Sequence, residues 1–388
     1  MPIPTTFKGY IRPDGRVGVR NHLLILSLTG LTGPTAQRIG RCISNAVVFG
    51  TPYGAGLLSA DLETQERTLI GLADNPNVGA VLVISADRPR LTRVCTGLKA
   101  AGKPVESVVL DDVGHDALVL TQQGTRLAAR MAKVISTRQR EPVPVATLTV
   151  GLECGRSDPS SGLIANPVVG GVADRLVAAG ATAILGETAE WVGAEDILQQ
   201  RAATVELGAA IVAAARGREQ LALAAGVSML GTNPGATNIE SGLSSIEEKS
   251  LGNILKGGNS TIQGLLNYAE RPTGNGLYLM DAPHYAPESL TGFAAAGAQL
   301  LLFTTGVGNS FVNSLAPTIK LSANPDTCQR LSEQLDFTCE QAFLGHESLD
   351  SAAERLYCEL LEVASGKYTW GEIFDEGGEA ISRFGAAL

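Results

Sequence analysis

Short apolar runs alternate with longer stretches whose apolar positions recur at helical spacing along almost the whole chain. In the first part, strands are expected at 23–28, 46–50, 78–85 and 105–110. Helices are expected at 34–44, 62–73, 91–101 and 117–138. Strand, helix and strand at this spacing indicate parallel strands joined by right-handed crossovers. The pattern therefore predicts an α/β fold.

The same alternation restarts after residues 139–144, a charged segment with two prolines that predicts a domain linker. Further strands are expected at 146–152, 181–185, 276–280, 299–304 and 318–322. Further helices are expected at 168–179, 194–216, 287–296 and 352–364. We predict two consecutive three-layer, Rossmann-like domains over residues 1–140 and 145–388, with a loosely docked tail after residue 367.

Composition narrows the class of protein without naming its chemistry. The 388 residues are 44% apolar and 18% charged, and 45 glycines against 5% aromatic residues indicate many tight turns. The net charge is −9 and no basic run follows a phosphate backbone, so no nucleic-acid partner is expected. No apolar run reaches the ~18 residues of a membrane span. A polar N-terminus and six scattered cysteines predict a reduced, cytoplasmic protein.

The first candidate motif leaves the strand expected at 146–152. Ligands of open α/β sheets bind at the carboxyl ends of the strands, and Cys154 stands at such an end. The following loop carries Ser157 and Asp158 and reaches Asn166 at the start of a helix. A thiolate with hydroxyls and backbone N–H groups can hold a metal or an anionic substrate. The alternative is a loop of turn-forming residues with an inert cysteine.

Acidic residues and one histidine follow two other strands. Glu187 and Glu190 come after the strand at 181–185 and can ligate a cation or act as acid and base, although acidic residues also favour a first helical turn. Asp281 and His284 follow the strand at 276–280. His284 suits a general base or a metal ligand, and its alternative is a solvated loop histidine.

A proline- and glycine-bearing loop with Asn233 and Asn238 leads into a predicted helix. Ser244 and Glu247 form a possible capping box at its start. Capping does not explain Lys249 near the same helix start, where a positive charge is disfavoured, and a substrate carboxylate would resolve that conflict.

Two further polar positions lie beyond this helix. Thr305 belongs to a small glycine loop that matches no nucleotide-binding motif, and Lys320 lies near a short strand, where its alternative is an exposed edge charge.

Several of these segments together are familiar. Residues 9–21, 154–167 and 246–252, extended by 316–321 and 336–339, resemble the altronate/galactarate dehydratase family. The resemblance implies a lyase that removes water from sugar acids, usually with a divalent metal such as Fe²⁺. A close relative, the large subunit of sulfolactate sulfo-lyase, removes sulfite from a smaller hydroxy acid. Family members often have a small additional domain or separate short subunit, so a small partner subunit and a homo-oligomer are expected.

The chain departs from the family pattern at four places. Thr51 and Ala55 replace a histidine and a cysteine, and Ala86 replaces a second cysteine. Val307 replaces the arginine of a glycine loop, and His284 replaces a glycine. These changes remove soft and imidazole ligands from the first domain and an anion contact from the second. They indicate a divergent member with a different substrate, metal or both.

The leading interpretation is a hydro-lyase that converts a small polyhydroxy acid to a 2-keto-3-deoxy acid. The alternatives are a sulfo-lyase acting on a sulfonated hydroxy acid and a non-catalytic sugar-acid-binding paralogue. The expected catalytic residues are Lys249, His284, Asp281 and Glu248. The expected ligands of Fe²⁺, or of Mn²⁺ or Mg²⁺, are Cys154, Glu187 and Glu190. The expected substrate-binding residues are Ser157, Asp158, Asn166, Asn233, Asn238, Thr305 and Lys320.

Overall fold

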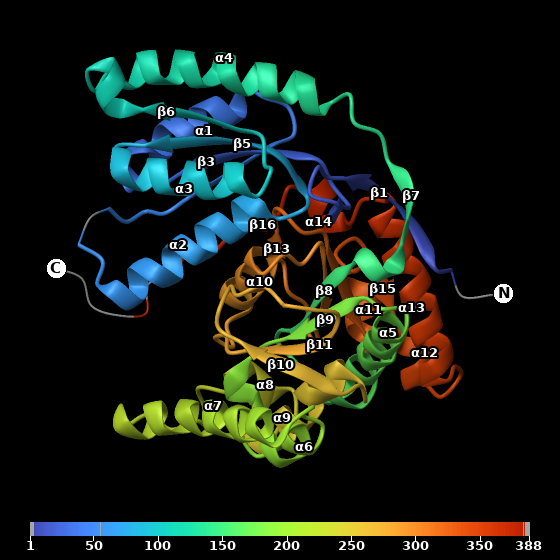
Figure 1. Cartoon of the computed structure of the whole chain (residues 1–388). Coiled ribbons are helices and arrows are strands. Elements are labelled where there is room, and N and C mark those ends of the chain that lie inside the picture. Colours follow the sequence, from blue (N-terminus) through green and yellow to red (C-terminus); the bar gives the residue numbers. More distant parts are fainter. Residues whose placement is uncertain (1–3, 55, 383, 385–388) are drawn as a thin grey trace.

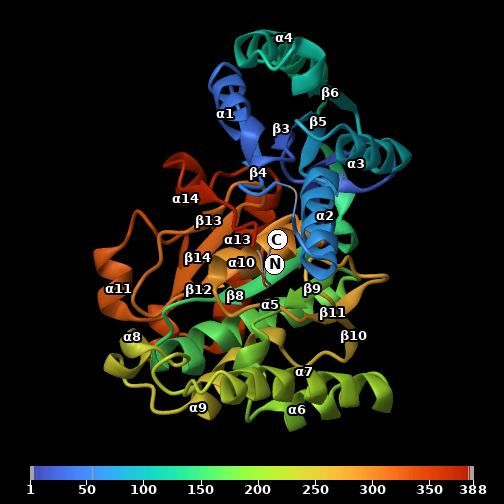
Figure 2. The same cartoon turned by 90° about the vertical axis from the view of Figure 1, so that its left-hand side faces the viewer.

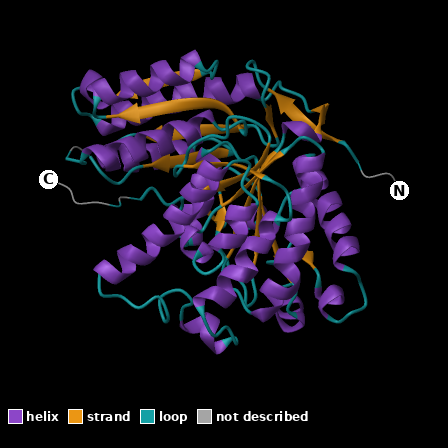
Figure 3. Ribbon diagram, turned by 60° about the horizontal axis from the view of Figure 1, so that its bottom comes forward, coloured by secondary structure: helices purple, strands orange, loops and turns teal. Residues whose placement is uncertain are grey.

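The computed structural model describes residues 4–54, 56–382 and 384, and it contains two parallel sheets with helices on both faces (Figures 1 and 3). The first sheet has the order β4-β3-β5-β6. Its strands are β3 (His22–Ser27), β4 (Ala46–Gly50), β5 (Val78–Ser85) and β6 (Val105–Val109). The α/β prediction is confirmed. Ala55, one of the positions that departs from the family pattern, lies outside the described residues.

Helices cover both faces of the first sheet. On one face lie α1 (Gly33–Arg41) and α4 (Ala117–Ile135), and on the other lie α2 (Ser59–Asp74) and α3 (Arg88–Ala100). Alternate residues of β3 serve the two layers: Ile25 packs with α1 and α4, whereas Leu24 packs with α2 and α3. Both faces are buried, which explains why the strands read as continuous apolar runs.

The second sheet has seven parallel strands in the order β10-β11-β9-β8-β12-β14-β15. They are β8 (Thr149–Cys154), β9 (Thr182–Leu185), β10 (Ile262–Leu266), β11 (Gly276–Met280), β12 (Leu300–Thr304), β14 (Thr318–Ser322) and β15 (Phe337–Thr338). The chain builds one side of β8 first and then crosses to β12 on the other side. The topological switch point therefore lies between β8 and β12, where Cys154 pairs with Thr304.

The helices around the second sheet form two layers and an end cap. One face is covered by α5 (Asn166–Ala178) and α13 (Leu349–Ala364), and the other by α10 (Ala286–Ala295). The carboxyl end is covered by α6 (Glu195–Gln200), α7 (Val205–Ala224), α8 (Ala236–Glu240) and α9 (Ile246–Ile254) (Figure 1). Shorter elements are α11 (Pro325–Arg330), α12 (Glu340–Phe343), α14 (Trp370–Ile373), β13 (Val312–Asn313) and β16 (Gly377–Gly378).

The single helix predicted over 194–216 is wrong, because the chain folds there as α6 and α7. Thr204 ends the break between them: its Oγ1 accepts a hydrogen bond from the Leu207 amide and begins a new helix. Just before it, Ala202 forms a bridge to Ile262 of β10, a strand that the apolar pattern did not reveal. A tertiary contact thus interrupts a stretch that is helical in pattern.

The segment at 139–144, predicted as the domain linker, contains a strand that was not predicted, β7 (Glu141–Pro144). It pairs antiparallel with β1 (Thr6–Ile11), which also pairs with β2 (Val17–Gly18). Phe7 and Val143 face each other and are buried. The prolines are compatible with this strand because β7 is at the edge of its sheet.

The tail after residue 367 is also not loosely docked. Glu372 forms an ion pair with Arg20 at 2.6 Å, and Glu376 forms one with the buried Lys320 at 2.9 Å. In addition, β16 pairs with β13. The tail thus supplies carboxylate partners to two buried cations, Arg20 in the first domain and Lys320 in the second. Its described residues therefore contact both domains.

The two sheets share one apolar core between α2 and α10. Leu69 and Leu72 of α2 belong to the same buried cluster as Leu290 and Phe293 of α10. Figure 2 shows α2 descending from the first domain toward the second sheet. The two domains are therefore packed together rather than joined only by a tether. In the described part of the chain, no helix is long and apolar enough to cross a membrane.

Candidate active site

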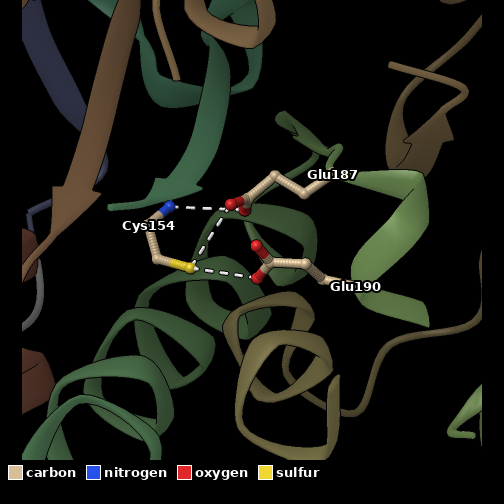
Figure 4. Close-up of side chains that lie close together, drawn as sticks. All are labelled: Cys154, Glu187 and Glu190. Atoms are coloured by element: carbon tan, nitrogen blue, oxygen red, sulfur yellow. Dashed lines mark hydrogen bonds between the residues drawn. The ribbon is translucent and has the colours of Figure 1, made fainter. Parts of the chain in front are cut away.

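A thiol and two carboxylates meet at the carboxyl ends of β8 and β9 (Figure 4). Cys154 is the last residue of β8, and Glu187 and Glu190 follow β9 on and around the 3-10 turn η5 (Thr188–Trp191). The Cys154 Sγ lies 3.3 Å from Glu187 Oε1 and 3.6 Å from Glu190 Oε2. All three side chains are buried. The structure thus brings together the three residues expected to bind a metal.

The backbone turns sharply after β9. Glu187 has a φ of 65°, in the left-handed region that non-glycine residues rarely occupy. A Cβ on the preceding Gly186 would lie 2.7 Å from the Phe293 ring, so any larger residue there would have to displace that ring. The Trp191 indole donates to the Gly186 carbonyl at 2.9 Å and holds the turn closed. Such a constrained turn at a strand end is typical of a functional position.

Two buried lysines hold the outer oxygens of these carboxylates. Lys256, in the turn η6 (Leu255–Gly257), forms an ion pair with Glu187 Oε2, and both side chains are fully buried. Lys249 of α9 lies 2.7 Å from Glu190 Oε1. Sequence reasoning missed Lys256. The available signal was weak. Lys256 stands between a leucine and a glycine, and that context does not distinguish a buried, paired lysine from an exposed one.

The charges in this cluster shift one another's pKa. Burial alone lowers the pKa of Lys256, but Cys154 and Glu187 raise it well above its ordinary value. Burial likewise opposes the charge of Lys249, yet Glu190 leaves its pKa raised. Burial raises the pKa of Glu190, but Lys249 and Lys256 reverse that effect and leave it lowered. Both lysines are therefore ammonium ions and Glu190 is a carboxylate at neutral pH.

The neighbouring Glu153 is a second residue that the sequence did not single out. It is fully buried on the opposite face of β8 from Cys154, and the Ser289 hydroxyl donates to its Oε2 at 2.6 Å. Burial, together with the charge of Glu187, raises the pKa of Glu153 well above its ordinary value. In the sequence Glu153 is simply the polar residue before Cys154 at a strand end. Its burial and its neighbours become visible only in the folded structure.

The donor set fits a divalent metal. A neutral thiol has one proton, but the Cys154 sulfur faces one oxygen from each of two carboxylates. The other oxygen of each carboxylate is occupied by a lysine. The sulfur and the two carboxylate oxygens, all of which can bind a metal, lie within 4.8 Å of one another. The single thiol proton cannot form a hydrogen bond to both oxygens. A cation that accepts thiolate and carboxylate ligands would resolve this arrangement.

Asn233, Asp281 and His284 surround this group. Lys249 donates to Asn233 Oδ1, and the Asn233 amide donates to Glu190 Oε1 at 3.3 Å. Asp281 Oδ1 accepts from Thr188 at 2.8 Å and from Arg218 of α7 at 2.6 Å. His284 is exposed and interacts electrostatically with Glu190 and Lys249. Desolvation lowers the pKa of His284, so its imidazole is neutral at pH 7.

Four predicted substrate-binding residues have their polar groups bound within the protein: three of them hold the Cys154 loop, and Thr305 holds its own glycine loop. Asp158 Oδ1 accepts from Ser160 at 2.6 Å, and its Oδ2 accepts from Asn324 at 2.8 Å. The Asn166 amide donates to the Gly252 carbonyl at 2.9 Å. Asn238 donates to the Ser157 carbonyl at 2.8 Å, while Thr305 accepts from the Gly308 amide.

Ser157 differs from these loop residues. Its hydroxyl is buried and makes no hydrogen bond within the described residues.

Two predicted residues lie apart from the cluster. Glu248 is exposed, and its Oε2 accepts from the Ser244 amide at 2.8 Å, while Ser245 caps α9 by accepting from the Glu248 amide. The capping pair is thus shifted by one residue from the expected Ser244 and Glu247. Lys320 is fully buried and bound to Glu376, so it is neither an exposed edge charge nor a neighbour of Cys154.

This doubly sheeted α/β fold, with a thiol–carboxylate group at a switch point, has known relatives. Residues 9–136 match the second domain of the D-galactarate dehydratase/altronate hydrolase family, and residues 145–386 match the C-terminal domain of the D-galactarate/altronate dehydratase family. The chain therefore belongs to the D-galactarate/altronate dehydratase family.

The individual relatives are named as lyases. The chain is 38% identical over 370 residues to (2R)-sulfolactate sulfo-lyase subunit beta of Chromohalobacter salexigens, covering 95% of this chain and 94% of the relative. It is 31% identical to altronate dehydratase of Bacillus subtilis, covering 99% of this chain and 78% of the relative. It is 30% identical to galactarate dehydratase (L-threo-forming) of Escherichia coli, covering 93% and 73%.

Proposed function

We propose that this protein is a hydro-lyase that removes water from a small polyhydroxy acid. The proton leaves carbon 2 and the hydroxyl leaves carbon 3, and the resulting enol becomes a 2-keto-3-deoxy acid. The observation that carries this proposal is the buried Cys154–Glu187–Glu190 group, with two lysine ammoniums against it and a neutral histidine beside it. Membership of a family whose named members are lyases supports it.

The expected cofactor is a divalent metal held by Cys154, Glu187 and Glu190. Such an ion supplies positive charge that stabilises the enediolate formed when carbon 2 loses its proton. A thiolate ligand favours Fe²⁺ over Mg²⁺, because Mg²⁺ prefers oxygen ligands. Mn²⁺ is the alternative, because it can bind both thiolate and carboxylate ligands.

Among the protein groups, His284 is the proposed base. Its imidazole is neutral at pH 7 and exposed to an incoming substrate, so it can accept the proton from carbon 2. Lys249 remains an ammonium ion, which makes it a partner for the substrate carboxylate rather than the base. Asp281, held by Thr188 and Arg218, and Asn233, held by Lys249, present oriented polar groups to the hydroxyls.

A second candidate function is sulfo-lyase activity, with sulfite rather than water leaving carbon 3. The observation in its favour is the match to the sulfo-lyase beta subunit over nearly the whole of both chains, whereas the dehydratases extend well beyond the matched region. On the same ground we propose a small partner subunit. We also propose self-association, which this match does not address. The six cysteines are all unpaired, which supports a reducing, cytoplasmic compartment.

The test is a substrate screen of the purified, anaerobically handled protein. Aldonic, aldaric and sulfonated hydroxy acids are incubated with and without Fe²⁺, Mn²⁺ and Mg²⁺, and both 2-keto acid and sulfite are measured. Keto acid without sulfite supports the hydro-lyase, and sulfite from a sulfonated acid replaces it with the second candidate. No product from any acid overturns both and leaves a sugar-acid-binding role.

A further inference from the structure

A third oxygen faces the Cys154 sulfur. Asn253 of α9 is 1% exposed, and its Oδ1 lies 3.6 Å from Cys154 Sγ. The Asn253 Nδ2 donates to the Glu190 carbonyl at 3.2 Å. A carbonyl oxygen accepts and cannot donate, so this bond fixes the amide with its oxygen toward the sulfur.

Hydrogen counting shows that this arrangement lacks donors. The single S–H of Cys154 faces three acceptors, at 3.3 Å to Glu187, 3.6 Å to Glu190 and 3.6 Å to Asn253. It can serve one of them. When Glu187 and Glu190 are both carboxylates, two of these three oxygens receive no hydrogen from the thiol. A buried acceptor without a donor costs about 1–3 kcal/mol, which indicates that another group binds beside the sulfur.

We infer that Asn253 is the fourth protein ligand of a divalent transition-metal site formed with Cys154, Glu187 and Glu190. The inference rests on the metal centre of the proposed function, but not on the reaction. The Cys154 sulfur and one oxygen each of Glu187 and Glu190 lie within 4.8 Å of one another, and the Asn253 oxygen, from a helix, lies 3.6 Å from the same sulfur. The set contains no imidazole.

The neutral amide has a consequence for charge. Three anionic ligands are opposed by the ammonium groups of Lys249 and Lys256, which are paired with the same carboxylates. A divalent ion then leaves the centre with one net positive charge, which suits an anionic substrate. An aspartate at position 253 would cancel that charge, whereas asparagine adds a ligand without doing so.

Co²⁺ binding to the metal-free, full-length protein tests the inference. A thiolate–Co²⁺ band in the near-ultraviolet reports Cys154, and the visible d–d bands report the number of ligands. We expect Asn253→Leu to weaken Co²⁺ binding by about 100-fold or more and to change the d–d bands, while the thiolate band remains. Asn253→Asp restores an oxygen and should bind within about tenfold of the wild type.

The two variants separate a ligand from a residue that only pins η5 through its Nδ2. Both remove Nδ2, so equal weakening in both, with wild-type d–d bands, would overturn the inference, as would unchanged binding in Asn253→Leu. Asn253→Ala serves in its place if the leucine variant does not fold, judged by thermal unfolding. Ser250→Ala, which removes a buried hydroxyl without a hydrogen-bond partner in the described chain, is the control on the same helix.

The result is independent of turnover. A wild-type protein that shows the thiolate band but converts no acid retains the metal site and loses the proposed reaction. A wild-type protein without the band overturns the metal site and the assignment of Asn253 together.

Discussion

Lys249 shows how a residue that looks misplaced in the sequence becomes explicable in the structure. A cation near a helix start opposes the helix dipole. Here its ammonium lies 2.7 Å from Glu190 and also donates to Asn233. The unfavourable interaction with the helix dipole is therefore offset by a carboxylate from another element. The side chain is 10% exposed, which leaves it reachable by a substrate carboxylate.

We expect Lys249→Met to lower turnover by about 100-fold or more while the protein still folds, because the substrate loses its cation and Glu190 loses its ion-pair partner. The free energy of unfolding should fall by up to ~3–5 kcal/mol for the same reason. Steady-state kinetics and thermal unfolding measure the two effects. Lys99→Met, at the exposed end of α3, is the control, and undiminished turnover in Lys249→Met would remove this residue from the site.

At the scale of elements, the packing of α2 against α10 joins the two domains. The Gly71 backbone lies so close to α10 that an added Cβ would be 2.3 Å from the Ala295 carbonyl oxygen. Gly97, on α3, has no atom within 4 Å of the same position. The two glycines are both helical, so they differ mainly in this contact.

Gly71→Ala should destabilise the protein by about 1–3 kcal/mol, since the helices must move apart to admit the methyl group. Gly97→Ala should instead stabilise it by about 0.5–1 kcal/mol, because alanine is the better helix former. Denaturant unfolding of both variants checks the pair. Equal effects would mean that the approach of α2 and α10 is not tight.

Across the whole molecule, buried ionisable groups make stability depend on pH. Desolvation, aided by the charge of Arg20, lowers the pKa of His22 to about 4, whereas an unfolded histidine titrates near 6.5. Between these values the unfolded chain binds the extra proton more readily than the native protein. The contribution of His22 to stability is therefore complete above pH 6.5 and is lost as the pH falls toward 4.

His22→Gln should accordingly flatten the fall in the free energy of unfolding between pH 6.5 and 4, while the exposed His346→Gln should not. Urea unfolding at pH 7, 6, 5 and 4 measures both variants. Parallel curves for wild type and His22→Gln would show that His22 does not cause the fall in this range and would overturn the prediction.

The elements predicted well are those whose pattern is local. The continuous apolar run at 78–85 is β5, and the amphipathic stretch at 352–364 lies within α13. The errors came where distant contacts decide. The strand at 141–144 was not predicted because its partner, β1, lies far away in the sequence, and the tail appears loose until Arg20 and Lys320 are seen to bind it. Lys256 was missed because its partner, Glu187, is far away in the sequence.

By itself, the sequence determined the α/β class, the metal-ligand candidates and the likeness to a family of sugar-acid dehydratases. These follow from periodicity, from residues at strand ends and from motifs, all of which are local along the chain. Only the tertiary structure decided that Cys154, Glu187 and Glu190 share one point, that two lysines hold their outer oxygens, and that Asn253 faces the same sulfur. The reason is physical: parallel strands bring their carboxyl ends together in an order that the chain does not show, and burial then makes each charge depend on its neighbours.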